Sequence, residues 1–346
     1  MSPRVGLIAR MDNGGLGNLT WEFWRHVRPA ATVVMQFGPK ARGGEYPERY
    51  HGDLHEGQEV YFNTPGKVVL GDAQARWLIE NSDVIYSAET FYSPVFAAAA
   101  SKAGVPTVLH SMPELYRPAE GGSHVWVPTD WELSRMPPGT DVVRVPVATD
   151  RFRTRPAEGP VDTFVHMAAP AMLDRNGTAI VLSALGKVRT RFRMVLLHPA
   201  TAPPAKVGNV TVETRGETEH YWESWADESF GALVLPRRYA GLSLPMQEAH
   251  AAGLPIVASN LSPQNAWPGI LPVQVSKSKP AQMAGGTFPV WDMAPARLAA
   301  ALDRMVKEPA LVAELQTGAA EATAAIAWSA LLPEYRRRLE EIAERG

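Results

Sequence analysis

Short apolar runs alternate with stretches of helical periodicity along most of the chain, a pattern typical of parallel sheets covered by helices. In the first half the pattern predicts strands at residues 5–9, 32–37, 83–87, 107–110, 124–127 and 142–145, with helices at 19–27 and 94–103. In the second half it predicts strands at 163–167, 194–198, 210–213, 232–235 and 256–259, with helices at 177–187, 244–252, 295–307 and, with interruptions, 310–345. The fold class is therefore α/β.

A polar segment divides the two series of strands. Residues 149–160 read TDRFRTRPAEGP, a charged stretch with two prolines, as an interdomain linker does. We therefore predict two Rossmann-like, doubly wound domains, residues 1–150 and 151–325. Such sheets bind ligands beyond the carboxyl ends of their strands, so two that face each other are expected to enclose a cleft.

Composition narrows the function classes. Of 346 residues, 45% are hydrophobic and 20% charged, as in ordinary globular proteins, and the net charge of −2 gives no global attraction to nucleic acid. The absence of cysteine excludes disulfides and thiolate chemistry. No apolar run reaches the length of a transmembrane segment, and the N-terminus lacks a secretory signal, so we expect a cytoplasmic protein.

A glycine-rich turn, NGGLGN at residues 13–18, separates the first predicted strand from the first helix. Gly14 and Gly15 allow the backbone to approach a phosphate at the helix start, although a plain tight turn explains them equally well. The spacing of a dinucleotide fingerprint fails, because Thr20 occupies its last glycine position. The second strand also ends without the expected acidic residue, which disfavours a dehydrogenase.

The most informative segment, RRYAGLSLPMQEAHAAGLPIVAS at residues 237–259, follows the apolar strand GALVLP. It combines a turn, a helix start, a Gly-Leu-Pro stop and another strand. This segment resembles the donor-binding signature of the retaining family-4 glycosyltransferases, which have the GT-B fold. Gly241, Leu242, Ser243 and Leu244 match the glycine-rich run, and Glu248 matches the second glutamate. The first glutamate of the signature is replaced here by Ala240.

The resemblance implies a role for each part of the segment. The amides at the helix start would bind the diphosphate of a nucleotide-sugar, and Glu248 would accept hydrogen bonds from ribose hydroxyls. Considered by itself, Glu248 can equally be a surface glutamate that the helix dipole favours. Ala240 removes a carboxylate that normally contacts the donor sugar, so the sugar is recognised differently or activity is reduced.

Weaker matches extend the resemblance along the chain. GVPTVLHSMPELY places His110 at a strand end, where the family often has a histidine near the donor sugar, although structural histidines are common there. Arg175 is the cation nearest to the family's phosphate-binding lysine, whose position holds Asn176, and it can instead pair with Asp174. The closing helix, residues 326–346, resembles one that packs back on the first domain in this family.

These features predict a hexosyltransferase-like enzyme with an acceptor-side first domain and a nucleotide-sugar-binding second domain. It would move a sugar from a nucleoside-diphosphate sugar, such as a UDP-sugar, to an acceptor hydroxyl with retention. No Asp-x-Asp motif is present, so neither a metal nor a cofactor is expected. A small molecule or glycan ranks first as acceptor, protein second and modified DNA third. A catalytically weak GT-B-like binding protein, an inverting GT-B enzyme and a sugar-nucleotide epimerase remain alternatives.

Overall fold

The computed structural model describes residues 2–37, 49–50, 57–154, 160–169, 171–239 and 241–346. It contains two compact units. Unit 1 comprises residues 1–146 and 328–346, and unit 2 comprises residues 147–327. The chain passes between the units twice, after residue 146 and after residue 327. The two segments lie side by side within unit 2, where the Val147 amide donates to the Ile326 carbonyl over 2.8 Å.

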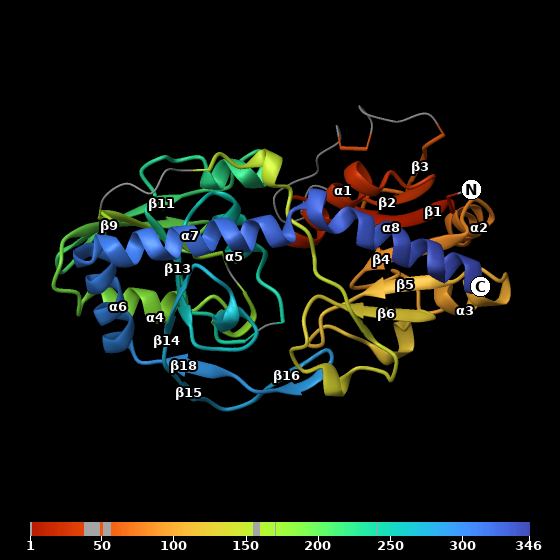
Figure 1. The fold of residues 1–346 in the computed structure, drawn as a ribbon. Coiled ribbons are helices and arrows are strands. Elements are labelled where there is room, and N and C mark those ends of the chain that lie inside the picture. Colours follow the sequence, from red (N-terminus) through yellow and green to blue (C-terminus); the bar gives the residue numbers. More distant parts are fainter. Residues whose placement is uncertain (1, 38–48, 51–56, 155–159, 170, 240) are drawn as a thin grey trace. The chain divides into compact units, whose positions relative to one another are not determined.

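Unit 1 is built on a parallel sheet whose strand order is β3-β2-β1-β4-β5-β6-β7 in the described part of the chain (Figure 1). Its strands are β1 (Val5–Arg10), β2 (Ala31–Met35), β3 (Glu59–Phe62), β4 (Val84–Ala88), β5 (Thr107–His110), β6 (His124–Val127) and β7 (Asp141–Val142). The central strands are buried on both faces, which explains why they read as continuous apolar runs.

Helices cover both faces of this sheet. They are α1 (Gly15–Val27), α2 (Asp72–Glu80), α3 (Phe96–Lys102) and α8 (Trp328–Arg345). On one face, α2 and α3 bury Leu78 and Phe96 against the aliphatic strand residues. On the other, Phe23 of α1 stacks on Tyr86 of β4, with ring centroids 4.0 Å apart. Tyr335 of α8 packs edge-on against Trp126 of β6, so the C-terminal helix completes the core of unit 1.

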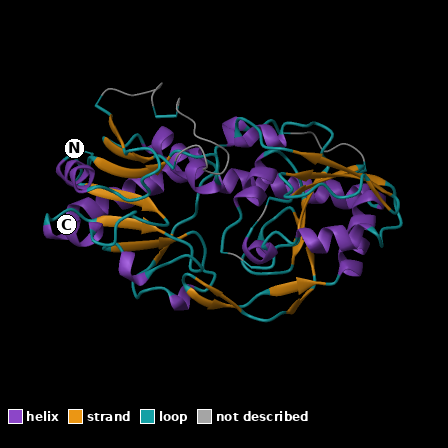
Figure 2. Cartoon of the chain, turned by 180° about the vertical axis from the view of Figure 1, so that it is seen from behind, coloured by secondary structure: helices purple, strands orange, loops and turns teal. Residues whose placement is uncertain are grey.

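Unit 2 repeats the architecture with the strand order β10-β11-β9-β8-β12-β13-β14 in its described residues, and all of these pairings are parallel except β10–β11. Figure 2 distinguishes the strands, in orange, from the helices, in purple. The strands are β8 (Thr163–Met167), β9 (Phe192–Leu197), β10 (Lys206–Val207), β11 (Val210–Arg215), β12 (Ala232–Leu235), β13 (Ile256–Ser259) and β14 (Ile270–Val273). The helices are α4 (Thr178–Leu185), α5 (Leu244–Ala251), α6 (Pro295–Lys307) and α7 (Pro309–Ile326). The core beneath α4, α6 and α7 is distinct from the core beneath α5, as a doubly wound sheet requires.

The structure adds elements that the sequence pattern did not predict. An edge strand, β3, and helix α2 lie between residues 59 and 80. Two small antiparallel pairs form an arm between β14 and α6: β15 (Val275–Lys277) with β18 (Trp291–Met293), and β16 (Ala281–Met283) with β17 (Gly286–Phe288). These strands are short and partly exposed, so their sequences lack the apolar runs by which the buried strands were recognised.

Candidate functional site

The strand order of unit 2 reverses direction between β8 and β12, which are neighbours in the sheet. The chain leaves β8 toward α4 on one face and β12 toward α5 on the other. The two loops therefore diverge at the carboxyl ends of adjacent strands, the point where open α/β sheets bind ligands. The loops are joined to each other, because the Arg238 amide donates to the Arg175 carbonyl over 3.0 Å.

Helix α5 begins at this point. Ser243 is its N-cap residue, and Pro245 stands in the first turn, where a missing N–H group is tolerated. No described side chain caps α5, because the Ser243 hydroxyl instead accepts a hydrogen bond from the Arg237 guanidinium over 2.8 Å. Gly241, Leu242 and Ser243 are all buried. Ala240, the residue that replaces the expected first glutamate, lies outside the described residues.

Glu248 lies in the second turn of α5 and is only 8% exposed. Its Oε2 accepts a hydrogen bond from Trp225 Nε1 over 3.0 Å. Burial raises the pKa of Glu248 to about 7, and the bond from Trp225 offsets part of that effect. A surface position for Glu248 is thus wrong: the carboxyl group is buried, anchored on one oxygen and about half ionised near neutral pH.

The loop before α4 carries Asp174 and Arg175. Both carboxylate oxygens of Asp174 accept hydrogen bonds from the first helical amides, those of Thr178 at 2.8 Å and Ala179 at 3.0 Å. The Asp174 carboxylate therefore occupies the α4 N-terminus. Arg175 is half-buried, and its guanidinium carbon lies 6.0 Å from the centre of the Tyr239 ring. Its side chain therefore lies close to the β12–α5 loop.

Two further residues fix this loop against the sheet. Gly177 adopts a left-handed conformation with φ +74°, and a Cβ there would lie 2.4 Å from the Pro236 carbonyl oxygen, so only glycine fits. His166, fully buried on β8, contacts the Val234 carbonyl through Nδ1 at 2.7 Å and the Thr178 hydroxyl through Nε2 at 2.9 Å. Burial lowers the pKa of His166 to about 4, so it serves as a neutral connector between β8, β12 and α4.

The adjacent arginines after β12 differ in their surroundings. Arg238 pairs with Asp292 at the base of the β15–β18 arm and donates to the Leu173 carbonyl. Arg237 is 6% exposed and donates to the N-cap serine of α5. The burial of Arg237 was not predicted from the sequence. The apolar strand directly before Arg237 was the available signal.

In unit 1, Gly14 and Gly15 stand where the prediction placed them, at the start of α1. Gly14 is the N-cap residue, and its amide donates to the buried Asp12 carboxylate over 2.9 Å. Arg49, which is 3% exposed, donates to the Asp12 carbonyl and to the Asn18 side chain. A helix start with a tightly held glycine turn is thus present, and the buried Arg49 that braces it was not predicted.

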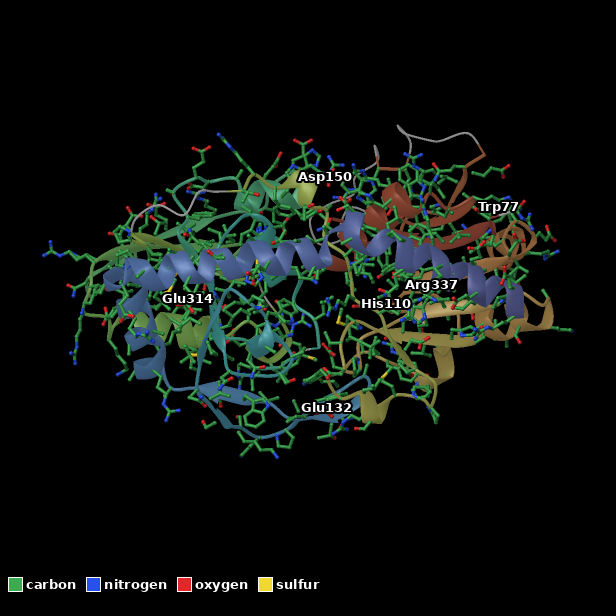
Figure 3. The ribbon with its side chains drawn as sticks, viewed as in Figure 1. Trp77, His110, Glu132, Asp150, Glu314 and Arg337 are labelled. Atoms are coloured by element: carbon green, nitrogen blue, oxygen red, sulfur yellow. The ribbon has the colours of Figure 1, made fainter. Side chains whose placement is uncertain are left out.

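His110 is the last residue of β5, and Figure 3 marks its position. It is 5% exposed and lies against the rings of Tyr86, Trp126 and Tyr335. Its Nδ1 meets the Tyr86 hydroxyl at 3.0 Å. Burial lowers the pKa of His110 to about 3, which the Val143 backbone offsets only in part, so the ring is neutral at physiological pH. In this structure His110 is a core residue of unit 1.

The aromatic and basic stretch of α1 is also largely core. Phe23 and Trp24 are buried, whereas Trp21 lies beneath the Arg49 guanidinium, 4.4 Å from ring centre to guanidinium carbon. Within the described ranges, no cluster of three or more histidine or acidic side chains is arranged to hold a metal ion. Over the same ranges, no helix combines the length and apolarity needed to cross a membrane.

No family model and no curated protein matches the sequence. Solved structures do match nearly the whole chain. Sucrose-phosphate synthase from Thermosynechococcus elongatus has a TM-score of 0.66 at 13% identity and covers 99% of both chains. HepE of Anabaena in complex with UDP-glucose has a TM-score of 0.66 at 14% identity, covering 98% of this chain and 100% of that one. The lipopolysaccharide outer core galactosyltransferase WaaB has a TM-score of 0.60 at 11% identity, covering 96% and 98%.

This chain has the GT-B fold. The predicted resemblance is thereby confirmed at the level of the fold. In this GT-B protein the predicted donor residues Arg175, Gly241–Leu244 and Glu248 belong to the two loops and the helix at the switch point of unit 2. Gly14, Gly15 and His110 belong to unit 1, where His110 is packed in the core.

Proposed function

We propose that this protein is a glycosyltransferase that takes a sugar from a nucleoside-diphosphate sugar and transfers it to an acceptor hydroxyl. Unit 1 would serve as the acceptor-side domain and unit 2 as the donor-binding domain. The single observation that carries the proposal is the start of α5, where a helix N-terminus without a side-chain cap is followed one turn later by the buried carboxylate of Glu248. Helix amides suit a diphosphate, and a carboxylate suits ribose hydroxyls.

A UDP-sugar is the first donor to test, since HepE was solved with UDP-glucose. Arg175 and the Gly14–Gly15 turn are the other groups that we assign to the donor. We also assign His110 to the donor sugar. Because its pKa is near 3, its ring would act there as a neutral hydrogen-bonding group. We propose a reaction with retention and without a metal ion, consistent with a sequence that has no Asp-x-Asp motif.

Calorimetric titration tests the donor. The protein is titrated with UDP, UDP-glucose and other nucleoside-diphosphate sugars, and Glu248→Gln is compared with Glu314→Gln, an exposed glutamate of α7. Losing a charge-assisted hydrogen bond to ribose should weaken nucleotide binding by roughly 10- to 150-fold in Glu248→Gln only. Unchanged affinity in that variant would remove the ribose role, and no binding of any nucleotide would remove the proposed function.

A second candidate, a GT-B-like protein that binds a nucleotide-sugar without turnover, is favoured by one observation. Alanine stands at position 240, where the family signature has a glutamate. Hydrolysis of each bound nucleotide-sugar, measured with and without a panel of small-molecule and glycan acceptors, separates the two functions. Turnover establishes the transferase, and the anomeric configuration of its product decides between retention and inversion. Tight binding without turnover supports the binding protein.

A further inference from the structure

Unit 2 carries a group of exposed basic side chains at the amino ends of its strands. They come from the turn between α4 and β9, from β10 and from the last turn of α6, which lie together at one end of the unit (Figure 1). We call this surface the basic edge and define it by the exposed residues Lys187, Arg189, Arg191, Lys206 and Lys307. The strands around it are parallel, so the basic edge lies opposite the carboxyl ends where α4 and α5 begin and is separate from the candidate donor site.

Hydrogen bonds join the elements of the basic edge. The buried Asp303 of α6 accepts hydrogen bonds from the Arg189 amide over 3.0 Å and from the Thr190 amide over 2.8 Å. The side chain of Asn209, in the turn between β10 and β11, donates to the Arg189 carbonyl over 3.2 Å. The α4–β9 turn is therefore fixed between α6 and the β10–β11 turn, and its basic side chains are held on one surface.

The acidic side chains of the same elements do not neutralise this surface. Asp303 directs its carboxylate to the backbone amides of the α4–β9 turn. Glu213 of β11 pairs with Arg193, and Glu308, which follows α6, pairs with Arg304. Among the described residues, no acidic side chain forms an ion pair with a member of the basic edge.

The helix dipoles account for only part of this charge. Both α4 and α6 end at the basic edge, and a cation near a helix C-terminus is stabilising. Lys187 and Lys307 can supply one cation to each helix. Arg189, Arg191 and Lys206 lie beyond the last helical turns, where the dipole effect has fallen off. A local positive surface thus remains on a chain whose net charge is −2.

We propose that the basic edge binds the surface of a membrane that contains anionic lipids. Such a surface attracts exposed basic side chains through its summed negative charge, and the attraction grows with each Lys or Arg. It requires no fixed position for any one phosphate group, which suits long side chains on a turn and a strand. The proposal is independent of the proposed function, because the basic edge contains none of the residues assigned to the donor.

Two features disfavour nucleic acid as the partner. None of the large hydrophobic side chains that are exposed in the described residues belongs to the basic edge, so single-stranded bases would have no ring to stack on. Helices α4 and α6 reach the edge with their C-termini, and so they do not present the N-terminal amides that bind backbone phosphates. A lipid surface needs neither feature.

The experiment measures co-sedimentation with phosphatidylcholine vesicles that contain about one-third phosphatidylserine, and with vesicles of phosphatidylcholine alone. The edge variant combines Lys187→Gln, Arg189→Gln and Arg191→Gln. A double-stranded DNA oligonucleotide is titrated in parallel. Melting temperatures and UDP affinities are recorded for every protein.

The matched control removes the same number of positive charges from a different basic cluster. It combines the substitutions Arg336→Gln, Arg337→Gln and Arg338→Gln in α8. In the wild type, Arg337 and Arg338 pair with Glu341 and Glu334. The two triple variants therefore have equal net charge, and they differ in whether the lost charges were paired.

We expect the wild type to bind the anionic vesicles, to ignore phosphatidylcholine alone and to be released by about 0.5 M salt. The edge variant should bind roughly 10- to 100-fold more weakly with unchanged UDP affinity, and the control variant should bind like the wild type. Lys206→Gln combined with Lys307→Gln leaves the α4–β9 turn intact, should also weaken binding, and carries the test if the edge variant does not fold.

Three results would overturn the proposal and leave the proposed function standing. The first is a wild type that does not bind anionic vesicles. The second is an equal loss in both triple variants, which would mean that net charge alone decides binding. The third is tighter binding of the DNA oligonucleotide than of the vesicles, which would assign the basic edge to nucleic acid.

Discussion

The two helices that begin at the switch point of unit 2 are topologically alike and chemically opposite. Both follow a buried parallel strand, and both have about the same length. At α4 the chain supplies its own anion, because the two carboxylate oxygens of Asp174 accept hydrogen bonds from two helical amides. At α5 the N-cap oxygen is turned to Arg237, and no described side chain caps the helix. A helix N-terminus is an anion site only where the protein leaves its amides for a ligand.

The β8–α4 and β12–α5 loops, which precede these two helices, also support each other structurally. Gly177 precedes α4 and lies under Pro236, the residue just before Arg237. His166 connects β12 to the first turn of α4. A substitution at the start of α4 should therefore also affect the start of α5.

The largest effect on stability is expected at Gly177, where the two loops are in tight contact. In Gly177→Ala, the new Cβ would lie 2.4 Å from the Pro236 carbonyl oxygen in a conformation with φ +74°. Strain and overpacking together should lower the free energy of unfolding by about 3–4 kcal/mol, measured by urea denaturation. Gly208→Ala is the control, because Gly208 also has a positive φ but its nearest neighbour is 3.5 Å away. Equal losses in both variants would mean that the loops do not press on each other.

The buried carboxylate of α5 predicts a pH-dependent effect. Burial raises the pKa of Glu248 from its ordinary value of 4.5 to about 7, so between these pH values the folded state binds a proton that the unfolded state has released. Its contribution to stability is therefore retained below pH 4.5 and lost as the pH rises to 7. Glu248→Gln should exceed the wild type by up to about 3 kcal/mol at pH 8 and by little at pH 4.5.

Comparing the variant with the wild type at each pH cancels the opposing contribution of the buried histidines. Burial lowers the pKa of His110, His166 and His250, so their contribution is lost as the pH falls below 6.5 in both proteins. Glu314→Gln supplies the control for the substitution itself. A stability difference that does not change with pH would show that folding does not raise the pKa of Glu248.

Removing the Asp174 carboxylate should leave the first amides of α4 without a side-chain acceptor, as at the start of α5. Asp174→Ala deletes the acceptor of two helical amides, and loss of such a cap should lower stability by about 1–2 kcal/mol. The vacated amides should then bind sulfate, so sulfate should raise the melting temperature of the variant more than that of the wild type. Asp174→Asn, which keeps one acceptor oxygen, should lie between them. A sulfate response equal to that of the wild type would contradict the view that Asp174 occupies an anion site.

Sequence reasoning succeeded for features that follow from the local residue pattern, such as buried strands. It failed for features that depend on contacts between residues distant in the sequence. The central strands of both sheets were predicted because their apolar runs are continuous, whereas β14 at the edge of the unit 2 sheet was not, and the GT-B fold followed from the α5 segment. The β15–β18 arm has no such runs. Glu248 was correctly placed in α5, but its burial beneath Trp225 depends on a residue 23 positions away. Arg237 and Arg238 are adjacent in sequence, and only the sheet and the arm distinguish their surroundings.

The smallest effect concerns the hydrogen bond that holds Glu248. Trp225→Phe removes the N–H donor from Oε2, and this bond lowers the pKa of Glu248 against the effect of burial. The pKa should therefore rise further, by up to about one unit, or about 1.4 kcal/mol. If ribose binds the ionised carboxylate, the midpoint at which UDP affinity increases with pH should move upward by the same amount. Trp222→Phe, in the same segment but stacked on His220, should leave the midpoint unchanged. A midpoint that moves in neither variant would mean that UDP binding does not depend on the charge of Glu248, and the α5 carboxylate would then be a structural group like Asp174.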